Sequence, residues 1–263
     1  MAFLSKVLTA KWKIPAEPVF DENGVWKTVK VALPGRDMSA RIWKVAVGRT
    51  DLYLLDTDFE DNIAEDRQVT HQLYGGDWEN RLKQELLLGI GGVRALRALG
   101  LNPTIYHYNE GHAAFAGIER LRECLQGGKL NFAESMELIR ASGLFTTHTP
   151  VPAGHDAFSE DMIGKYLGNK LPSIGIDWAT LMSLGKINPD NRDEKFSMSV
   201  LAANMSQNVN GVSMLHGAVS QEIFANMYPG YLPEELYISY VTNGVHYPTW
   251  AAKEWKAIHA KVF

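Results

Sequence analysis

Histidine, glutamate and asparagine side chains gather in four short segments of the chain: residues 109–112, residues 148–152, the turn and helix around His216, and residues 242–246. Imidazole, carboxylate and amide groups together supply hydrogen-bond donors and acceptors, so several of them around one ligand can orient a molecule rich in hydroxyl groups and discriminate between those groups. The residue types therefore indicate a polar cleft for a sugar, provided that the fold brings the four segments to one place.

The periodicity around these segments predicts alternating helices and strands after residue 77. Leu82, Leu86, Ile90, Val93 and Leu96 recur every three or four residues, as on one face of an amphipathic helix. The further elements expected are strands at 104–108, 144–147 and 237–241 and helices at about 112–125, 131–143 and 213–227. Such alternation is typical of an α/β fold with a mainly parallel sheet. Because ligands bind beyond the carboxyl ends of the strands in such sheets, we expect the four polar segments to meet at one edge.

The first part of the chain has a different character. Residues 25–56 contain short β-branched and aromatic runs separated by Gly and Pro, a pattern that predicts an antiparallel meander. We therefore divide the chain into a β-rich part, residues 1–76, and a Rossmann-like α/β part, residues 77–263. Residues 165–195 show the weakest pattern and are expected to form a loop-rich connection.

Each polar segment also has a purely structural explanation. The Asn-Gly pairs at 210–211 and 243–244 form turns readily, because both residue types tolerate positive φ. His216 can equally be a hydrogen-bonded histidine inside a helix. Glu110 and Asp77 can stabilise helix N-termini through the helix dipole.

Three further patterns lack the structural context that their chemistry requires. His107 and His112 resemble a zinc motif, but His107 is expected in a strand and the spacing is one residue too long. The Gly-Ile-Gly-Gly run at 89–92 lies inside a helical pattern, so it predicts close helix packing and not a phosphate loop. Cys124 has no evident activating base. We therefore predict neither a metal site nor a thiol nucleophile.

The composition of the chain excludes several classes of protein. The chain has 263 residues, of which 46% are hydrophobic and 21% charged, with a formal net charge of −4. These values exclude a disordered or collagen-like chain, and the mild acidity gives no electrostatic footprint for nucleic acid. No apolar run approaches the ~20 residues of a membrane span, and the amino-terminal residues lack the apolar core of a signal peptide. Together with a single cysteine, this predicts a cytoplasmic protein.

Five motifs in a fixed order carry a family resemblance. They are Tyr-Gly-Gly-Asp-Trp-Glu-Asn-Arg-Leu-Lys-Gln-Glu at 74–85, His-Tyr-Asn-Glu-Gly-His at 107–112, Thr-Thr-His-Thr-Pro at 146–150, Val-Asn-Gly-Val-Ser-Met-Leu-His at 209–216 and Val-Thr-Asn-Gly-Val-His-Tyr-Pro-Thr-Trp at 241–250. Over about residues 34–250 the chain resembles the α-glucan phosphorylases, which include glycogen, starch and maltodextrin phosphorylases, and above all their bacterial branch.

The resemblance implies one half of a two-domain glycosyltransferase B-type fold, with catalysis between two Rossmann-like domains. The implied reaction is phosphorolysis of an α-1,4-glucan or maltooligosaccharide by inorganic phosphate, which yields glucose 1-phosphate. The implied cofactor is pyridoxal phosphate, which the family binds through a lysine of the carboxyl-terminal domain and whose phosphate group assists proton transfer. The protein would hold the sugar while an oxocarbenium-like centre forms.

The resemblance also implies roles for individual residues. His148 and Asn243 match the residues that hold the reacting glucose, and we expect them at the catalytic site. The resemblance also implies substrate-binding residues around the acceptor site, its mobile gate and the sheet edge. They are Glu110, His112, Asp77, Arg81 and His216.

The departures from the family pattern concern the gate and the cofactor. The upstream glycine-rich loop and the Gly-Asn-Met-Lys run that carries the cofactor lysine are absent, and Glu110-Gly111 stands where muscle-type members have Asp-Thr. We therefore expect a truncated segment without the pyridoxal-phosphate domain, with no cofactor bound to this chain and no phosphorylase activity of the chain alone. Its cut edge is expected to expose apolar surface and to favour self-association. The alternatives are a segment of a nucleotide-sugar glycosyltransferase similar to glycogen synthase, and a non-catalytic oligosaccharide-binding module.

Overall fold

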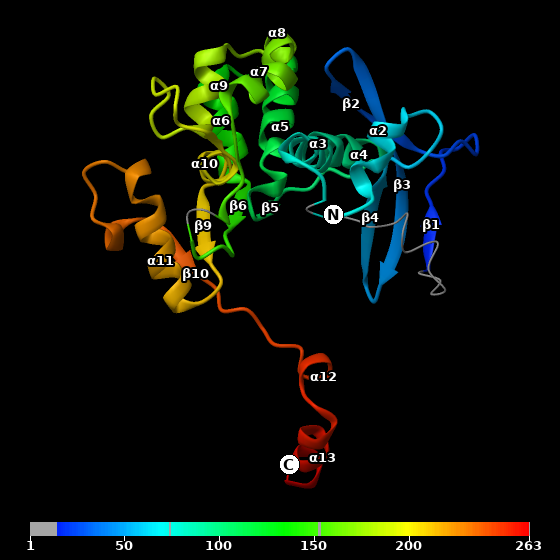
Figure 1. The fold of residues 1–263 in the computed structure, drawn as a ribbon, viewed down its shortest axis with the longest axis vertical. Coiled ribbons are helices and arrows are strands. Elements are labelled where there is room, and N and C mark those ends of the chain that lie inside the picture. The colour runs from blue at the N-terminus through cyan, green and yellow to red at the C-terminus, as the bar shows by residue number, and fades with distance from the viewer. Residues whose placement is uncertain (1–14, 74, 152–153, 263) are drawn as a thin grey trace.

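The antiparallel sheet predicted for the first part of the chain is confirmed. The structure is a computed structural model that describes residues 15–73, 75–151 and 154–262, so residues 1–14 of the β-rich part lie outside it. The strands are β1 (Ala16–Pro18), β2 (Thr28–Leu33), β3 (Arg36–Val47) and β4 (Thr50–Asp56). All three other strands pair with the long β3 in antiparallel register, for example Val31 with Met38 and Lys44 with Tyr53. Figure 1 shows this sheet in blue, to one side of the α/β part.

A long helical segment joins the two parts. After α2 (Ala64–Arg67) and a 3-10 turn (Gln68–Thr70), α3 (Trp78–Leu86) continues through a π-helical turn (Leu87–Gly91) into α4 (Gly92–Ala98). The predicted amphipathic helix is thus confirmed, and Gly100, with a φ of 73°, follows its end. A Cβ on Gly89 would lie 2.7 Å from the backbone nitrogen of Ala116, so this glycine allows close packing against α5 (Phe115–Gln126), as predicted.

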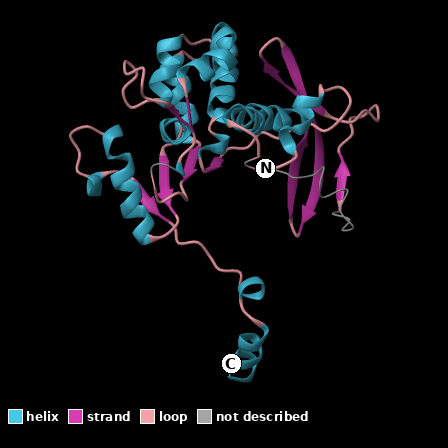
Figure 2. Cartoon of the chain, viewed as in Figure 1, coloured by secondary structure: helices cyan, strands magenta, loops and turns pink. Residues whose placement is uncertain are grey.

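The second sheet is parallel and has the order β10-β9-β6-β5. Its strands are β5 (Tyr106–Asn109), β6 (Gly143–Thr146), β9 (Asn208–Gly211) and β10 (Ile238–Tyr240), and Figure 2 shows them as a group separate from the antiparallel strands. A 3-10 turn (Gly111–Ala113) and α5 follow β5, α6 (Phe132–Ala141) precedes β6, and α11 (Met214–Phe224) with a 3-10 turn (Ala225–Met227) follows β9. The expected α/β alternation and the predicted capping box of Asn131 with Glu134 are both confirmed.

The prediction of a loop-rich connection over residues 165–195 is wrong for residues 165–185, which are mainly helical, and is confirmed for residues 186–195. This region lies among short helices α7 (Glu160–Leu167), α8 (Leu171–Ile174) and α9 (Trp178–Gly185), followed by α10 (Met198–Asn204). A two-stranded ribbon of β7 (Ala157–Phe158) and β8 (Phe196–Ser197) brackets α7 to α9. The side chains of Ser159 and Asp177 cap α7 and α9 by accepting backbone N–H groups. Buried Tyr166 and Leu181 attach these helices to the main core, which compensates for their low periodicity.

One hydrophobic core runs through both parts of the chain. It includes Val31 and Ile42 of the antiparallel sheet, Leu82 of α3, and Phe115 and Phe145 of the α/β part. An apolar cavity of about 420 Å³ lies between β4, α4 and β5, lined mainly by Leu, Val, Ile and Tyr side chains. Among the described residues, no helix combines the length and apolar character needed to cross a membrane.

The carboxyl-terminal arm, residues 241–262, extends away from the two sheets (Figure 1). It contains α12 (Tyr247–Trp250) and α13 (Lys253–Val262), neither of which has a buried residue. Trp250 is 77% exposed and Trp255 is 67% exposed. The described residues therefore do expose apolar surface here, and self-association through it remains a prediction.

Candidate substrate-binding site

Hydrogen bonds join the polar segments that follow three neighbouring parallel strands. Beyond β5, the Glu110 N–H donates to the Thr146 carbonyl at 2.9 Å, and beyond β6 the Thr147 N–H donates to the Asn210 carbonyl at 3.0 Å. The Thr146 hydroxyl also donates to Asn210 Oδ1 at 2.9 Å. The expectation that the four segments meet at one edge of the sheet is therefore confirmed for those that follow β5, β6 and β9.

Glu110 has an unusual backbone conformation at the end of β5. Its φ of 64° and ψ of 176° lie in a region that glycine occupies almost alone, and in the described part of the chain no other non-glycine residue has a positive φ. Its Oε1 accepts the His148 N–H at 2.5 Å and the Thr149 hydroxyl at 3.1 Å. Such a conformation costs roughly 1–3 kcal/mol, so the surroundings must hold Glu110 in it.

Two of the predicted site residues, His148 and His216, each have a buried ring nitrogen, Nε2, without a hydrogen-bond partner among the described residues, as does His155, which was not predicted. His216 lies in the first turn of α11, where its N–H is accepted by the Ser213 side chain at 3.1 Å. Its Nδ1 accepts the Val212 N–H at 3.2 Å, so a neutral ring carries its proton on Nε2. Because buried polar atoms are nearly always paired, the Nε2 atoms of His148 and His216 are the candidate ligand contacts at this edge.

Asn243 reaches the same edge through its backbone. Its N–H donates to the Val212 carbonyl at 3.0 Å, directly after β10, while its side chain is exposed. The structure therefore places Asn243 beside the turn that leads to His216, at the start of the carboxyl-terminal arm.

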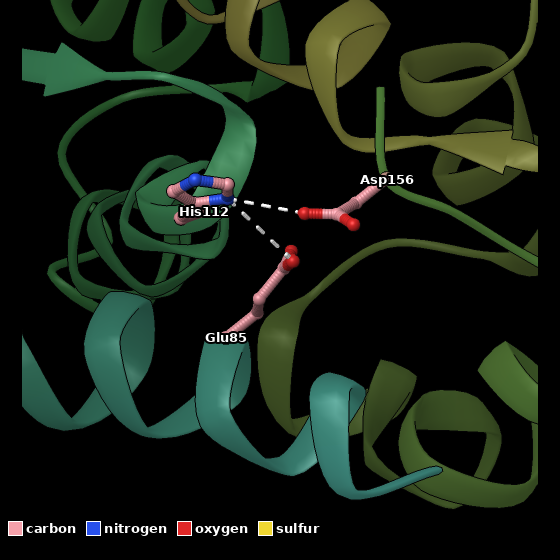
Figure 3. Close-up of side chains that lie close together, drawn as sticks. All are labelled: Glu85, His112 and Asp156. Carbon is pink, nitrogen blue, oxygen red and sulfur yellow. Dashed lines mark hydrogen bonds and ion pairs between the residues drawn. The ribbon is translucent and has the colours of Figure 1, made fainter. Parts of the chain in front are cut away.

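His112 lies in a second cluster with the carboxyl groups of Glu85 and Asp156 (Figure 3), and Arg81 contacts all three side chains. Arg81, only 5% exposed, donates to Asp156 Oδ2 from Nε at 3.2 Å and from Nη2 at 2.7 Å. Its Nε also lies 3.1 Å from Glu85 Oε1, one helical turn further along α3. His112 Nδ1 lies 2.5 Å from Arg81 Nη2 and 3.1 Å from Asp156 Oδ2. The four side chains thus form one charged network, in which Arg81 and Glu85 are buried and His112 and Asp156 are half-buried.

The two carboxyl groups of this network have opposite pKa shifts. Burial raises the pKa of Glu85 well above its ordinary value, and the neighbouring Asp156 charge adds to this, against the attraction of Arg81. Burial acts in the same direction on Asp156, but hydrogen bonds with His112 and Arg81 outweigh it and hold the pKa of Asp156 far below its ordinary value. Asp156 is therefore the anion that balances Arg81, while Glu85 keeps its proton to a higher pH.

Glu85, His112 and Asp156 could in principle ligate a metal ion, since one atom from each lies within 4.8 Å of the others. The Arg81 guanidinium, however, already lies within 3.2 Å of all three side chains and neutralises the carboxylate. A divalent ion would have to displace a buried arginine from its partners. We therefore assign Arg81 as the cation of this cluster and propose no metal there.

Asp77 acts at the beginning of α3. Its side chain caps the helix by accepting the Asn80 N–H at 2.9 Å, which is the structural role considered from the sequence. A small cavity of about 230 Å³ beside it is also lined by Trp78, Arg81 and Asp156. The structure thus places Asp77 one turn before the charged network, and its role toward a substrate remains a prediction.

Glu85 and Asp156 were not predicted from the sequence. Glu85 has a weak sequence signal, because it is a charged residue close to the apolar face of its helix. It lies three positions after Leu82 and one before Leu86, which are both buried on that face. Asp156 offers none, since its partner Arg81 is 75 positions away. His155 was also missed; burial lowers its pKa, and its Nδ1 lies 2.5 Å from the Ser199 hydroxyl.

Lys170 and Lys186 fit a pyridoxal-phosphate site poorly. Lys170 has a pKa lowered by burial to about 8, but its Nζ donates to the carbonyls of Ala32 and Tyr166, between β2 and α7. Buried Lys186 pairs with Glu160 at 2.7 Å. Neither lysine lies among the residues at the sheet edge, so no step of the chemistry is assigned here through that cofactor.

Comparisons with known proteins identify the family of the chain. A family model described as carbohydrate phosphorylase matches residues 99–260. The glycogen phosphorylase of Mycobacterium tuberculosis is 43% identical over 256 residues, covering 92% of this chain and 29% of that protein. The maltodextrin phosphorylase of Thermococcus litoralis is 39% identical over 94% of this chain, and the glycogen phosphorylase of Aquifex aeolicus is 32% identical over the same share. The chain spans 29–35% of the length of these relatives.

Proposed function

The chain belongs to the carbohydrate phosphorylase family, and we propose that it forms the glucan-binding wall of an α-glucan phosphorylase active site. In this proposal it is part of one half of a two-domain glycosyltransferase B-type fold. The whole enzyme would release glucose 1-phosphate from an α-1,4-glucan with inorganic phosphate. Phosphate and pyridoxal phosphate would be bound by parts of the enzyme outside the described residues.

One observation carries the proposal. The buried Nε2 atoms of His148 and His216 have no partner among the described residues, and they follow the neighbouring strands β6 and β9. Hydrogen bonds from such preorganised groups discriminate strongly in favour of a substrate that carries matching hydroxyl groups. His148 would hold the reacting glucose, and His216 would donate a hydrogen bond to the sugar from Nε2. Asn243, at the start of the carboxyl-terminal arm, would complete the site.

The chain's contribution to catalysis would be positioning. A sugar held by several fixed groups reacts from one geometry, which removes much of the entropic cost of bringing glucan and phosphate together. Because the edge lies on rigid strands and the first turn of a helix, its hydrogen-bonding groups need little reorganisation when charge develops on the sugar.

The first test is saturable binding of maltoheptaose to this chain by isothermal titration calorimetry. We expect binding, no comparable binding of a β-1,4-linked cellooligosaccharide, and about tenfold weaker maltoheptaose binding by His148→Asn, the loss expected for about 1.4 kcal/mol. His259→Asn, on the exposed helix α13, is the matched control and should bind as the wild type does. Equal affinity for both sugars, or for His148→Asn and the wild type, would contradict the proposed site.

A second test measures catalysis. The chain replaces the matching 256-residue segment of the M. tuberculosis glycogen phosphorylase, and release of glucose 1-phosphate from maltoheptaose and phosphate is followed. We expect an active chimera whose kcat falls with His148→Asn and is unchanged with His259→Asn. An active chimera that tolerates His148→Asn would refute the role assigned to this histidine.

A further inference from the structure

Glu110 was expected to bind substrate, but its carboxylate is directed to the protein itself. Oε1 accepts the His148 N–H and the Thr149 hydroxyl, and these are the bonds that tie residues 148–149 back to the end of β5. The preceding residue, Thr147, is held separately by its bond to Asn210 of β9. The loop that carries the His148 ring is therefore attached to the sheet at two points, and Glu110 provides one of them.

The backbone conformation of Glu110 indicates that its attachment to residues 148–149 serves function and not local stability alone. A glycine would adopt a φ of 64° and a ψ of 176° without strain, whereas a glutamate is strained there. The adjacent Gly111 packs closely against the start of α10, where a Cβ on it would lie 2.9 Å from Met198 Cβ. Strained residues of this kind cluster at functional sites, where the surrounding structure maintains them.

From this geometry we propose that Glu110 is a positioning residue: its strained backbone aims the carboxylate at the 148–149 loop and thereby holds the His148 imidazole ready for a sugar. The inference rests on the proposed function. Glu110 then does not bind the glucan itself but positions His148, which does. This role explains why an acidic side chain occupies a position whose backbone conformation favours glycine.

Three substitutions separate strain from attachment. Glu110→Gly removes both, Glu110→Ala keeps the strain and removes the attachment, and Glu110→Gln keeps a carbonyl oxygen that can accept the same two bonds. Glu137→Gln, on an exposed position of α6, is the matched control. The readouts are amide hydrogen exchange at His148, the NMR resonances of its ring, the melting temperature, and the dissociation constant for maltoheptaose.

We expect protection of the His148 amide to fall at least tenfold in the Gly and Ala variants and to be largely kept in the Gln variant. Maltoheptaose affinity should fall about tenfold in the first two variants and less than threefold in the third. Glu110→Gly should melt at a higher temperature than Glu110→Ala, because only the glycine is free of strain. The control should match the wild type in every readout.

Two results would overturn the proposal: unchanged His148 amide protection in Glu110→Gly, or lost protection with unchanged maltoheptaose affinity. Failure of the wild-type chain to bind maltoheptaose would count against the proposed function and not against this inference. In that event the amide protection and the His148 ring resonances decide alone, since a ring that Glu110 positions must change its environment in the Gly and Ala variants but not in Glu137→Gln.

Discussion

Replacing Asp156 by Asn tests the charged network around Arg81 most directly, because Asn keeps the side-chain volume and removes the charge. Arg81 is 5% exposed and has its shortest carboxylate contact with Asp156, at 2.7 Å. Breaking a buried ion pair costs about 3–5 kcal/mol when the remaining charge is left without compensation. The structure predicts a smaller loss, of about 2 kcal/mol, because Glu85 Oε1 lies 3.1 Å from the Arg81 Nε and can take over as the anion.

Glu85→Gln alone is expected to be at least as stable as the wild type near neutral pH, because it removes the loss of stability that rising pH causes at Glu85. Glu85 has a raised pKa and is the carboxyl group that keeps its proton longer, so the neutral amide resembles its native state. The double variant removes both carboxylates of the network, while Arg81 stays buried. It should therefore be less stable than the sum of the two single effects by about 0.5–3 kcal/mol, the range seen for residues that share one network.

The assay is urea unfolding at pH 7, followed by tryptophan fluorescence, for the wild type, both single variants and the double variant. The m-values must agree, so that differences in midpoint report stability. Asp193→Asn, an exposed aspartate, is the control and should stay within about 0.5 kcal/mol of the wild type. Additivity of the two substitutions within about 0.5 kcal/mol would refute the assignment of Glu85 as the reserve anion for Arg81.

Three further outcomes are expected. Because the pKa of Glu85 is raised in the folded protein, its contribution to stability is complete below about pH 4.3 and declines as pH rises toward its folded pKa. The pKa of Asp156 is lowered, so its contribution to stability declines as pH falls below about 3.9. Melting temperatures from pH 3 to 9 should show both limbs, and Glu85→Gln should remove the alkaline one. Gly89→Ala should cost about 1–3 kcal/mol in urea unfolding because a Cβ would meet the α5 backbone, while Gly92→Ala, with open space around it, should stabilise by about 0.5–1 kcal/mol. Asn131→Ala should cost about 1 kcal/mol by removing the α6 cap, measured in the same way.

The elements that could be predicted from the sequence are those whose signals are local. The helix through Leu82 and Leu96, the strand before Asn109 and the capping box at Asn131 each depend on residues within a few positions of one another. The common sheet edge followed from these elements, because the carboxyl ends of parallel strands lie on one side. The helices between residues 160 and 185 were missed because they are short and interrupted by Gly164, Gly168, Gly175 and Pro172, although the caps at their starts were readable.

The charged network was beyond prediction for a physical reason. Its energy comes from contacts between Arg81 and Asp156, which are far apart in the sequence, and from burial, which no local pattern specifies for charged residues. The sequence identified Arg81 and His112 by their family motifs but not what they touch. The bonds that engage them, and the bonds of Glu110 to residues 148–149, come only from the three-dimensional structure.

These contacts divide the predicted site residues into two kinds. Arg81, Glu110 and Asp77 have side chains committed to partners within the protein: an ion pair, a loop and a helix cap, respectively. His148 and His216, in contrast, each present a buried nitrogen with no partner among the described residues. Because a group that already has its hydrogen bonds gains little from a new ligand while an unsatisfied group gains much, substitution of the two histidines should act on sugar affinity directly. Substitution of the committed residues should act on it through the positions of their partners.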